Sequence, residues 1–148
     1  MSLKLTEEKE KVLHKKLEPV KEITPEITEL ILEMKQTMNE NDGVGLAANQ
    51  VGRDLQMFVI DEGLAKTENV PSVYINPEIT DVSKEPTHME EGCLSVPGYF
   101  KEMERSKKIR IKALDENGKK FKIKATGFLA RVLQHETDHL NGILIKDK

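Results

Sequence analysis

Residues 134–142 read QHETDHLNG, and the rest of the chain can be understood from this stretch. His135 and His139 are four residues apart, so on an α-helix their side chains project from one face and can hold a single metal ion. Glu136 lies about 100° around the helix from His135, where its carboxylate can reach a water molecule without being a ligand. This is a His-Glu-x-x-His signature, typical of metal-dependent hydrolases.

An exposed helix carrying these residues by chance would show the same letters. The flanking residues favour a buried helix, because apolar side chains surround the signature on more than one face: Phe128, Leu129, Val132, Leu133 and Leu140. Burying histidine and acidic side chains there is costly unless something pairs with them, and a metal ion would do so. We expect Thr126 to cap this helix and Gly142 to end it.

A catalytic site of this kind has three protein ligands and one position open for water. Only nine residues follow His139, and Ile145 stands where a metzincin would need another histidine, so the third ligand is expected upstream. The single cysteine, Cys93, lies in EEGCLSVPG at 90–98. This run indicates a tight loop rather than an apolar core segment, which favours a thiolate ligand over a small buried residue.

Three motifs follow one another along the chain: GVGLAANQVG at 43–52, EGCLSVPG at 91–98 and QHETDHLNG at 134–142. In order and spacing they resemble the signature motifs of the peptide deformylase family. The resemblance covers most of the chain and is weakest at its start, where His14 stands in place of a common arginine. It implies an α+β fold, with antiparallel β-sheets packed around a central metal-binding α-helix, and one catalytic domain over residues 1–148.

This resemblance implies a metal-dependent hydrolase that removes the N-formyl group from the initiator methionine of nascent peptides and releases formate. Cys93, His135 and His139 would bind one divalent metal ion. Fe(II) is favoured by the family, and Zn, Ni or Co also suit one thiolate and two imidazoles. The resemblance implies the N-formylmethionyl peptide as the substrate partner. The ribosome is a further candidate partner.

The resemblance also implies roles in catalysis. Glu136 would transfer the proton, and the Gln50 amide and the backbone N–H of Leu94 would stabilise the oxyanion. Three charged residues match family positions that orient metal ligands, with surface ion pairing as the alternative. They are Glu91, Arg105 and Asp138.

For the substrate, the resemblance implies pairing of an extended peptide with the main chain of Val44, Gly45 and Leu46. The methionine side chain would enter an apolar slot, for which plain core packing is the alternative interpretation. Its matched positions are Val44, Met89, Phe128 and Val132. Asn49 stands where many family members carry another residue. We expect no consequence, because its side chain need not face the metal.

Residues 43–50 also satisfy the G-x-G-x-x-A pattern of dinucleotide-binding turns. Such a turn follows a strand and opens a helix. Here a helix is expected before the motif and a strand, 56–61, after it. We therefore interpret the small residues as allowing close approach of the backbone to a ligand.

Several other elements are legible. Thr24 and Pro25 should open a helix that ends near 39–42, and a second strand is expected at 72–76, stopped by Pro77. Residues 62–71 are expected to form a loop, and the charged stretch 83–90 to lead into the cysteine loop. Residues 109–125 alternate apolar and basic around Asn117-Gly118 and predict an amphipathic hairpin with solvated lysines.

Composition limits the function classes. The chain has 148 residues, is 37% hydrophobic and carries a net charge of −3. These values fit one domain and give no reason to expect nucleic acid or an anionic membrane as partner. No apolar run is long enough to span a membrane and no secretory signal is evident, so we expect a cytoplasmic protein.

Two competing hypotheses remain at this stage. The first is a metallohydrolase of another small amide, with the same metal site and a different pocket. The second is a non-catalytic metal-binding domain. A closed structural site would need a fourth ligand, and His88 or His14 is the remaining histidine able to supply it.

Overall fold

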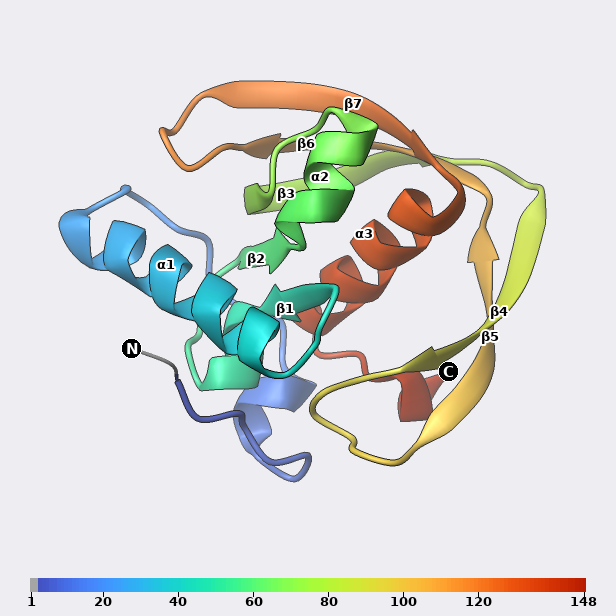
Figure 1. The fold of residues 1–148 in the computed structure, drawn as a ribbon, viewed down its shortest axis with the longest axis horizontal. Coiled ribbons are helices and arrows are strands. Elements are labelled where there is room, and N and C mark those ends of the chain that lie inside the picture. Colours follow the sequence, from blue (N-terminus) through green and yellow to red (C-terminus); the bar gives the residue numbers. More distant parts are fainter. Residues whose placement is uncertain (1–2) are drawn as a thin grey trace.

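Helix α3 (Gly127–Leu140) occupies the middle of the fold and packs against strands of two separate β-sheets. The computed structural model describes residues 3–148, and Figure 1 shows the strands arranged around this helix. Apolar side chains on several faces of α3 are buried, as the sequence predicted. The polar side chains of residues 131–139 on this helix are buried or half-buried, and none is exposed.

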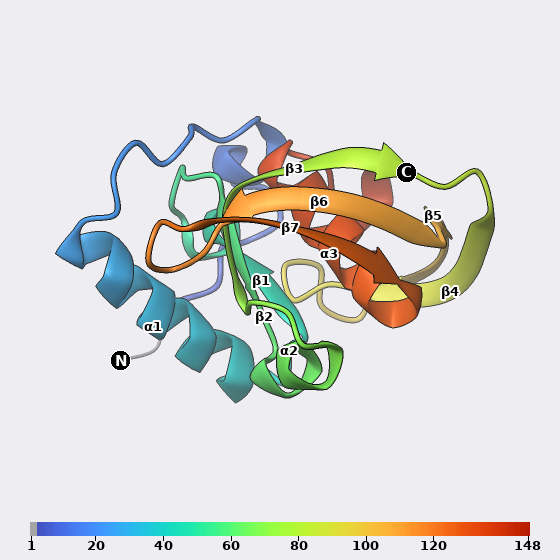
Figure 2. The same ribbon diagram turned by 90° about the horizontal axis from the view of Figure 1, so that it is seen from above.

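Both sheets are antiparallel, which confirms the expected α+β fold. Figure 2 shows β3, β6 and β7 side by side across α3. The larger sheet has the order β1 (Gly45–Ala47), β2 (Met57–Ile60), β3 (Val73–Val82), β6 (Lys108–Leu114) and β7 (Lys120–Thr126). The smaller sheet pairs β4 (Pro86–Gly92) with β5 (Phe100–Ser106).

Besides α3, helix α1 (Pro25–Glu40) packs against β1 and β2 of the larger sheet, and the 3-10 helix η3 (Ile145–Asp147) packs against β5 of the smaller one. None of the helices within residues 3–148 combines the length and apolar character needed to cross a bilayer. The remaining α-helix is α2 (Glu62–Glu68), and the other short 3-10 helices are η1 (Lys11–His14) and η2 (Ala48–Val51).

Strand β2 separates two apolar layers. Phe58 and Ile60 pack in the cluster that includes α3, whereas Met57 and Val59 pack in the cluster that includes α1. Because both faces of the strand are covered, its sequence is a continuous apolar run rather than an alternating one. The layer on the α3 side fixes the helix that carries the two histidines.

Two local predictions are confirmed. Helix α1 begins at Pro25, and the Thr24 hydroxyl accepts a hydrogen bond from the Ile27 N–H at 3.3 Å. The hairpin of β6 and β7 pairs Ile109, Ile111 and Ala113 with Ala125, Ile123 and Phe121, with the lysines facing outward.

The prediction of a loop at 62–71 was wrong, because α2 lies there. The Asp61 carboxylate caps it by accepting from the Leu64 N–H at 3.0 Å, and Asn69 ends it in a left-handed conformation. Only Ala65 of this helix is buried, so the sequence lacks the apolar periodicity that would have indicated it.

Pro77 does not stop β3, contrary to expectation. The strand continues to Val82, and its pairing with β6 shifts register between Ile75 and Glu78. A proline is tolerated at such an irregularity because the ladder needs no N–H there. The Asn76 amide stabilises the bend by bonding the N–H and the carbonyl of Val20, each at 2.8 Å.

The charged stretch 83–90, which was expected to lead into the cysteine loop, is largely strand, since β4 begins at Pro86 and pairs with β5 along its whole length. Most side chains of the two strands are exposed or half-exposed, so the sequence lacks the apolar alternation that would have predicted these strands. Their buried members include Glu91 and Arg105, which are charged. This small sheet delivers Cys93 to the end of α3.

At the ends of α3 one expectation holds and one does not. Thr126 stands at the N-cap position, but its side chain makes no capping hydrogen bond. Gly142 ends the helix with a φ of +76°, and the Ile143 N–H bonds the Asp138 carbonyl at 2.9 Å. This 6→1 hydrogen bond is the Schellman arrangement, for which glycine has the freest backbone.

Candidate metal centre

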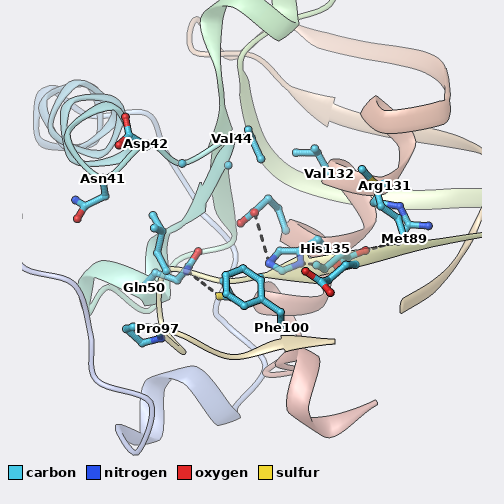
Figure 3. Close-up of a pocket in the computed structure, with 18 of the residues that line it drawn as sticks. Asn41, Asp42, Val44, Gln50, Met89, Pro97, Phe100, Arg131, Val132 and His135 are labelled. Carbon is cyan, nitrogen blue, oxygen red and sulfur yellow. Dashed lines mark hydrogen bonds and ion pairs between the residues drawn. The ribbon is translucent and has the colours of Figure 1, made fainter. Parts of the chain in front are cut away.

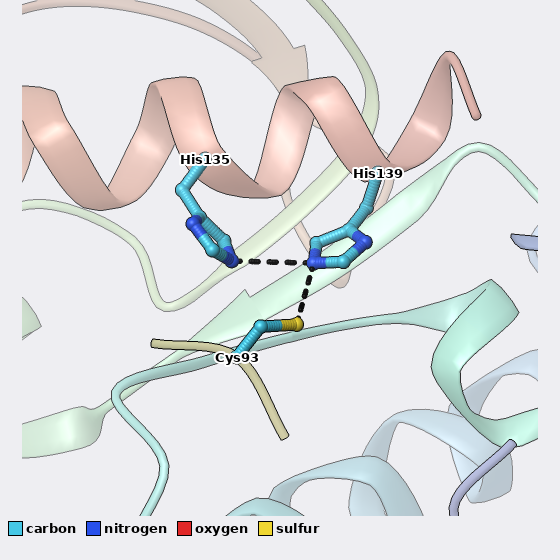
Figure 4. A group of neighbouring side chains, drawn as sticks. All are labelled: Cys93, His135 and His139. Carbon is cyan, nitrogen blue, oxygen red and sulfur yellow. Dashed lines mark hydrogen bonds between the residues drawn. The ribbon is translucent and has the colours of Figure 1, made fainter. Parts of the chain in front are cut away.

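Cys93, His135 and His139 converge on one point, as the sequence predicted. Their ligand atoms lie within 4.8 Å of one another. Nε2 of His139 is 3.2 Å from Nε2 of His135 and 3.2 Å from Sγ of Cys93 (Figure 4). A soft sulfur and two imidazole nitrogens facing a common point can hold one transition-metal ion.

The pKa values of the two histidines are shifted in opposite directions. Burial works against a charged His135, yet its hydrogen bonds with Cys93 and Glu91 raise the pKa of this ring to about 10. Burial and the neighbouring positive charges lower the pKa of His139 well below its usual value, which keeps that ring neutral. The pKa values of the two rings therefore differ, with that of His135 raised and that of His139 lowered.

A buried network of charged side chains contacts His135 at Nδ1, the ring nitrogen that does not face His139. Oε1 of Glu91 lies 2.9 Å from Nδ1 of His135, and Arg105 binds both oxygens of Glu91 at 3.0 and 2.9 Å. Arg105 also reaches Asp138 at 2.5 Å. Glu91 and Arg105 are 8% and 5% exposed, so surface ion pairing does not describe them.

Arg131 is a member of this network that sequence reasoning missed. It is buried on α3, and its Nη1 lies 2.5 Å from Oε2 of Glu91. Its Nη2 donates to the carbonyl and the hydroxyl of Thr87 on β4, each at 2.9 Å. Burial disfavours a charged Glu91, but the bonds from His135 and Arg105 hold its pKa well below the usual value. An arginine among apolar helix residues was the signal that could have identified it.

Glu136 faces the same point from α3. It is 3% exposed, its Oε2 is 4.0 Å from Nε2 of His135, and its Oε1 has no partner within residues 3–148. Burial raises the pKa of Glu136 to about 7. A Cβ on Gly45 would lie 2.6 Å from Oε2 of Glu136, so a larger residue would displace this carboxylate. The carboxylate can therefore gain or lose a proton near neutral pH.

Gln50 and Leu94 lie beside the cysteine, where they were expected. Gln50 Nε2 donates to Cys93 Sγ at 3.4 Å and to Ser95 Oγ at 3.1 Å. Its Oε1 accepts from the Ala47 N–H at 3.0 Å, which fixes the amide orientation. Ser95 is a contact that the sequence analysis did not anticipate.

A cavity of about 520 Å³ opens in front of these residues (Figure 3). Val44, Met89 and Phe128 line it and are 46%, 48% and 45% exposed, which argues against plain core packing. Val132 lines it as well but is 4% exposed. Phe100, on the opposite side from Val132 in Figure 3, is a lining residue that was missed.

The predicted main-chain segment has two different parts. Gly45 lines the cavity, whereas Leu46 is fully buried in the cluster that includes α1 and does not line it. Both belong to β1, which is one of the two edge strands of the larger sheet. An edge strand has unpaired main-chain groups to which an extended peptide can add.

The histidines considered for a closed structural site lie elsewhere. His88 is exposed on β4 next to Glu104, and His14 is exposed and bonds the Glu8 carbonyl. Among the residues described, the group has no fourth member that could act as a ligand, whether cysteine, histidine or an acidic residue. Three side chains that could hold a metal ion, beside an open cavity and a buried carboxylate, are typical of metal-dependent hydrolases with one metal ion.

Comparisons with known proteins narrow this class. Residues 2–148 match the polypeptide deformylase family. The chain is 49% identical to peptide deformylase 1 of Clostridium perfringens over 138 residues, which is 93% of this chain and 91% of that protein. The crystal structure of the peptide deformylase from Thermotoga maritima superposes with a TM-score of 0.93 at 42% identity, covering 100% of this chain and 97% of that one.

A further match is the Ehrlichia chaffeensis peptide deformylase in complex with actinonin, with a TM-score of 0.89 and 42% identity. It covers 97% of this chain and 87% of that one. The chain belongs to the peptide deformylase family. It is accordingly a metal-dependent amide hydrolase that removes the N-formyl group from nascent peptides, and its Cys-His-His group fits a single metal ion.

Proposed function

We propose that Cys93, His135 and His139 are the metal ligands and that Fe(II) is the metal under which the enzyme is most active, with Zn, Ni or Co as substitutes. The observation that carries this proposal is the convergence of one sulfur and two imidazole nitrogens within 4.8 Å at the wall of an open cavity. When bound, the metal ion supplies a Lewis acid that activates water and polarises a carbonyl group.

Glu136 is the proton-transfer residue in this proposal. It takes a proton from the attacking water and returns one to the leaving amine. The pKa of about 7 suits both steps, because the carboxyl group is present in both protonation states near neutral pH. Gly45 supports this role, since the absence of a Cβ lets the carboxylate lie against β1.

Gln50 and Leu94 stabilise the oxyanion that forms on the formyl carbonyl. Gln50 Nε2 contacts Cys93 Sγ at 3.4 Å, so an N–H of this amide can be shared with an oxygen that forms beside the sulfur. The Leu94 N–H donates to no group within residues 3–148 and follows Cys93 directly. Donors fixed before the reaction lower its barrier, because they need no reorganisation.

The formyl-methionine lies in the cavity with its peptide beside β1. Main-chain groups of Val44, Gly45 and Leu46 pair with the peptide, because β1 offers a free sheet edge. Half-exposed apolar residues receive the methionine side chain, since burying them against it removes apolar surface from water. These residues are Val44, Met89 and Phe128, with Val132 at the base.

Residues 1–148 act as one catalytic domain in the cytoplasm, where nascent peptides are made. Segments from the first, middle and last thirds of the chain all contribute to the site, which supports a single domain. Ribosomes are proposed as a partner because they carry the substrate. Co-sedimentation of the protein with purified ribosomes tests this, and its absence at low salt would remove the ribosome from the partners.

Formate release by anaerobically purified protein reconstituted with Fe(II) tests the main proposal. We expect formate from formyl-Met-Ala-Ser, and no free amino group from acetyl-Met-Ala-Ser in a parallel assay of amine release. Equal turnover of the two would favour another amide hydrolase. A site that binds metal but releases no formate would favour the non-catalytic domain. Actinonin, bound by the Ehrlichia chaffeensis relative, should compete with the formylated peptide.

A further inference from the structure

The two histidines of the site differ in the nitrogen that faces away from the other ligands. Nδ1 of His135 lies 2.9 Å from Oε1 of Glu91. His139 turns Nε2 toward Cys93 and His135, which leaves Nδ1 on the far side of its ring (Figure 4). This Nδ1 is buried and has no partner among the residues described. Metal-binding histidines almost always donate their second N–H to an acceptor.

Asn49, which belongs to the 3-10 helix η2, lies beside His139 of α3. Its Nδ2 donates to the His139 carbonyl at 2.6 Å and faces the Val12 carbonyl at 3.4 Å. Because both neighbours are acceptors, the amide orientation is fixed with Nδ2 toward them. Its Oδ1 therefore points elsewhere, and within residues 3–148 this buried oxygen has no partner either.

A buried donor and a buried acceptor thus lack partners in two residues that already contact each other. Leaving either group unsatisfied is costly, so a native arrangement normally pairs them. A histidine ring that binds a metal through Nε2 is neutral, and its single proton is then on Nδ1. The unpartnered nitrogen is then a donor and the unpartnered oxygen of Asn49 an acceptor, and the two do not bond each other in this structure.

We propose that Asn49 is the positioning residue of His139, as Glu91 is of His135. Its Nδ2 holds the main chain of His139, and in the metal-bound protein its Oδ1 accepts the proton on Nδ1. Gln50, the next residue, contacts Cys93. The consecutive side chains Asn49 and Gln50 of η2 therefore orient two ligands, His139 from α3 and Cys93 from the cysteine loop. This inference rests on the proposed metal site and replaces the expectation that Asn49 has no consequence.

The test uses the zinc-loaded protein with ¹⁵N-labelled histidine, and it compares wild type with Asn49→Leu, which is similar in size and forms no hydrogen bond. We expect slowly exchanging ring N–H signals from His135 and His139 in wild type. In Asn49→Leu the His139 signal should be lost and zinc should pass to a chelator about 10-fold faster. The His135 signal should persist, because Glu91 is untouched.

Asn49→Asp separates the two contacts, since it keeps an acceptor oxygen and removes the Nδ2 donor. It should retain the His139 signal. If Asn49→Leu does not fold, Asn49→Ser serves, because its short side chain cannot span both contacts. A purely structural role would lower the Tm of the metal-free variants and leave zinc release unchanged. Persistence of both ring signals in Asn49→Leu, or unchanged zinc release, would overturn the inference.

Asn141→Leu is the matched control. Asn141 lies at the same end of α3, is exposed, and bonds the Thr137 carbonyl at 3.2 Å. Neither its ring signals nor its zinc release should differ from wild type. Wild-type protein that binds no zinc through Cys93, His135 and His139 would refute the proposed metal site. Wild type that binds it, with an Asn49→Leu variant that behaves identically, would refute only the role of Asn49.

Discussion

Two buried carboxylates flank the His135 ring, one from the end of β4 and one from α3, and their surroundings are opposite. Glu91 is 8% exposed and bonds His135, Arg105 and Arg131. Glu136 is 3% exposed, and one of its oxygens has no partner among the residues described. Burial alone raises the pKa of both carboxyl groups.

The hydrogen-bond partners of the two carboxyl groups then make their pKa values differ. Hydrogen bonds hold the pKa of Glu91 far below the usual value, whereas that of Glu136 stays raised at about 7. Environments that push the pKa values of neighbouring acids apart indicate different roles. Glu91 is suited to permanent charge and to orienting a ligand, and Glu136 to carrying a proton.

Glu136→Gln should have the largest effect on this comparison, because it keeps the shape and removes the proton carrier. We expect kcat for formate release to fall by about 100- to 10,000-fold. Metal content and Tm should stay near wild type, since no charged partner is lost. Turnover near the wild-type rate, with metal bound, would refute the proton-transfer role.

Gly45→Ala should come next. Its Cβ would meet Oε2 of Glu136 at 2.6 Å and displace that carboxylate without touching Glu91. A displacement near 1 Å can cost on the order of 100-fold in kcat. The control is the double variant with Glu136→Gln, in which Gly45→Ala should add little. Independent effects would show that Gly45 acts through another group.

Glu91→Gln should weaken the buried charge network that orients His135. Losing the carboxylate leaves Arg105 and Arg131 buried without their shared partner, which costs roughly 3 kcal/mol of unfolding free energy. Metal affinity should fall by about 10-fold or more, because His135 loses its orienting bond. Chelator competition and thermal unfolding measure both.

Glu104→Gln is the matched control for Glu91→Gln. It lies on β5 of the same small sheet, where its carboxylate is exposed next to His88. Both quantities should stay at wild-type values. If Glu91→Gln behaves like this control, the network does not hold His135.

Phe128→Ala should have the smallest effect, because it touches neither carboxylate. It removes an apolar wall of the cavity, so kcat/KM for formyl-Met-Ala-Ser should fall on the order of 10-fold, mainly through KM. Leu32→Ala, an exposed leucine on α1 that does not line the cavity, is the control. A fall in kcat alone would indicate that Phe128 affects the catalytic groups instead.

The sequence by itself determined those parts of the molecule that depend on neighbours close along the chain. Helix α1 with its Thr24 cap and the hairpin of β6 and β7 follow from periodicity and turn residues. The spacing of His135 and His139 places both rings on one face of α3 for the same reason. Cys93 as third ligand was inferred by elimination and by resemblance, since no local pattern aims its side chain.

Only the tertiary structure decided the contacts between distant segments. The bond between Arg131 and Glu91 joins residues 40 positions apart, and that between Asn49 and His139 joins residues 90 apart. The small sheet of β4 and β5, the free edge of β1 and the raised pKa of Glu136 depend likewise on packing. Local patterns encode which face of an element is apolar, but not which polar partner from elsewhere in the chain will meet it once water is excluded.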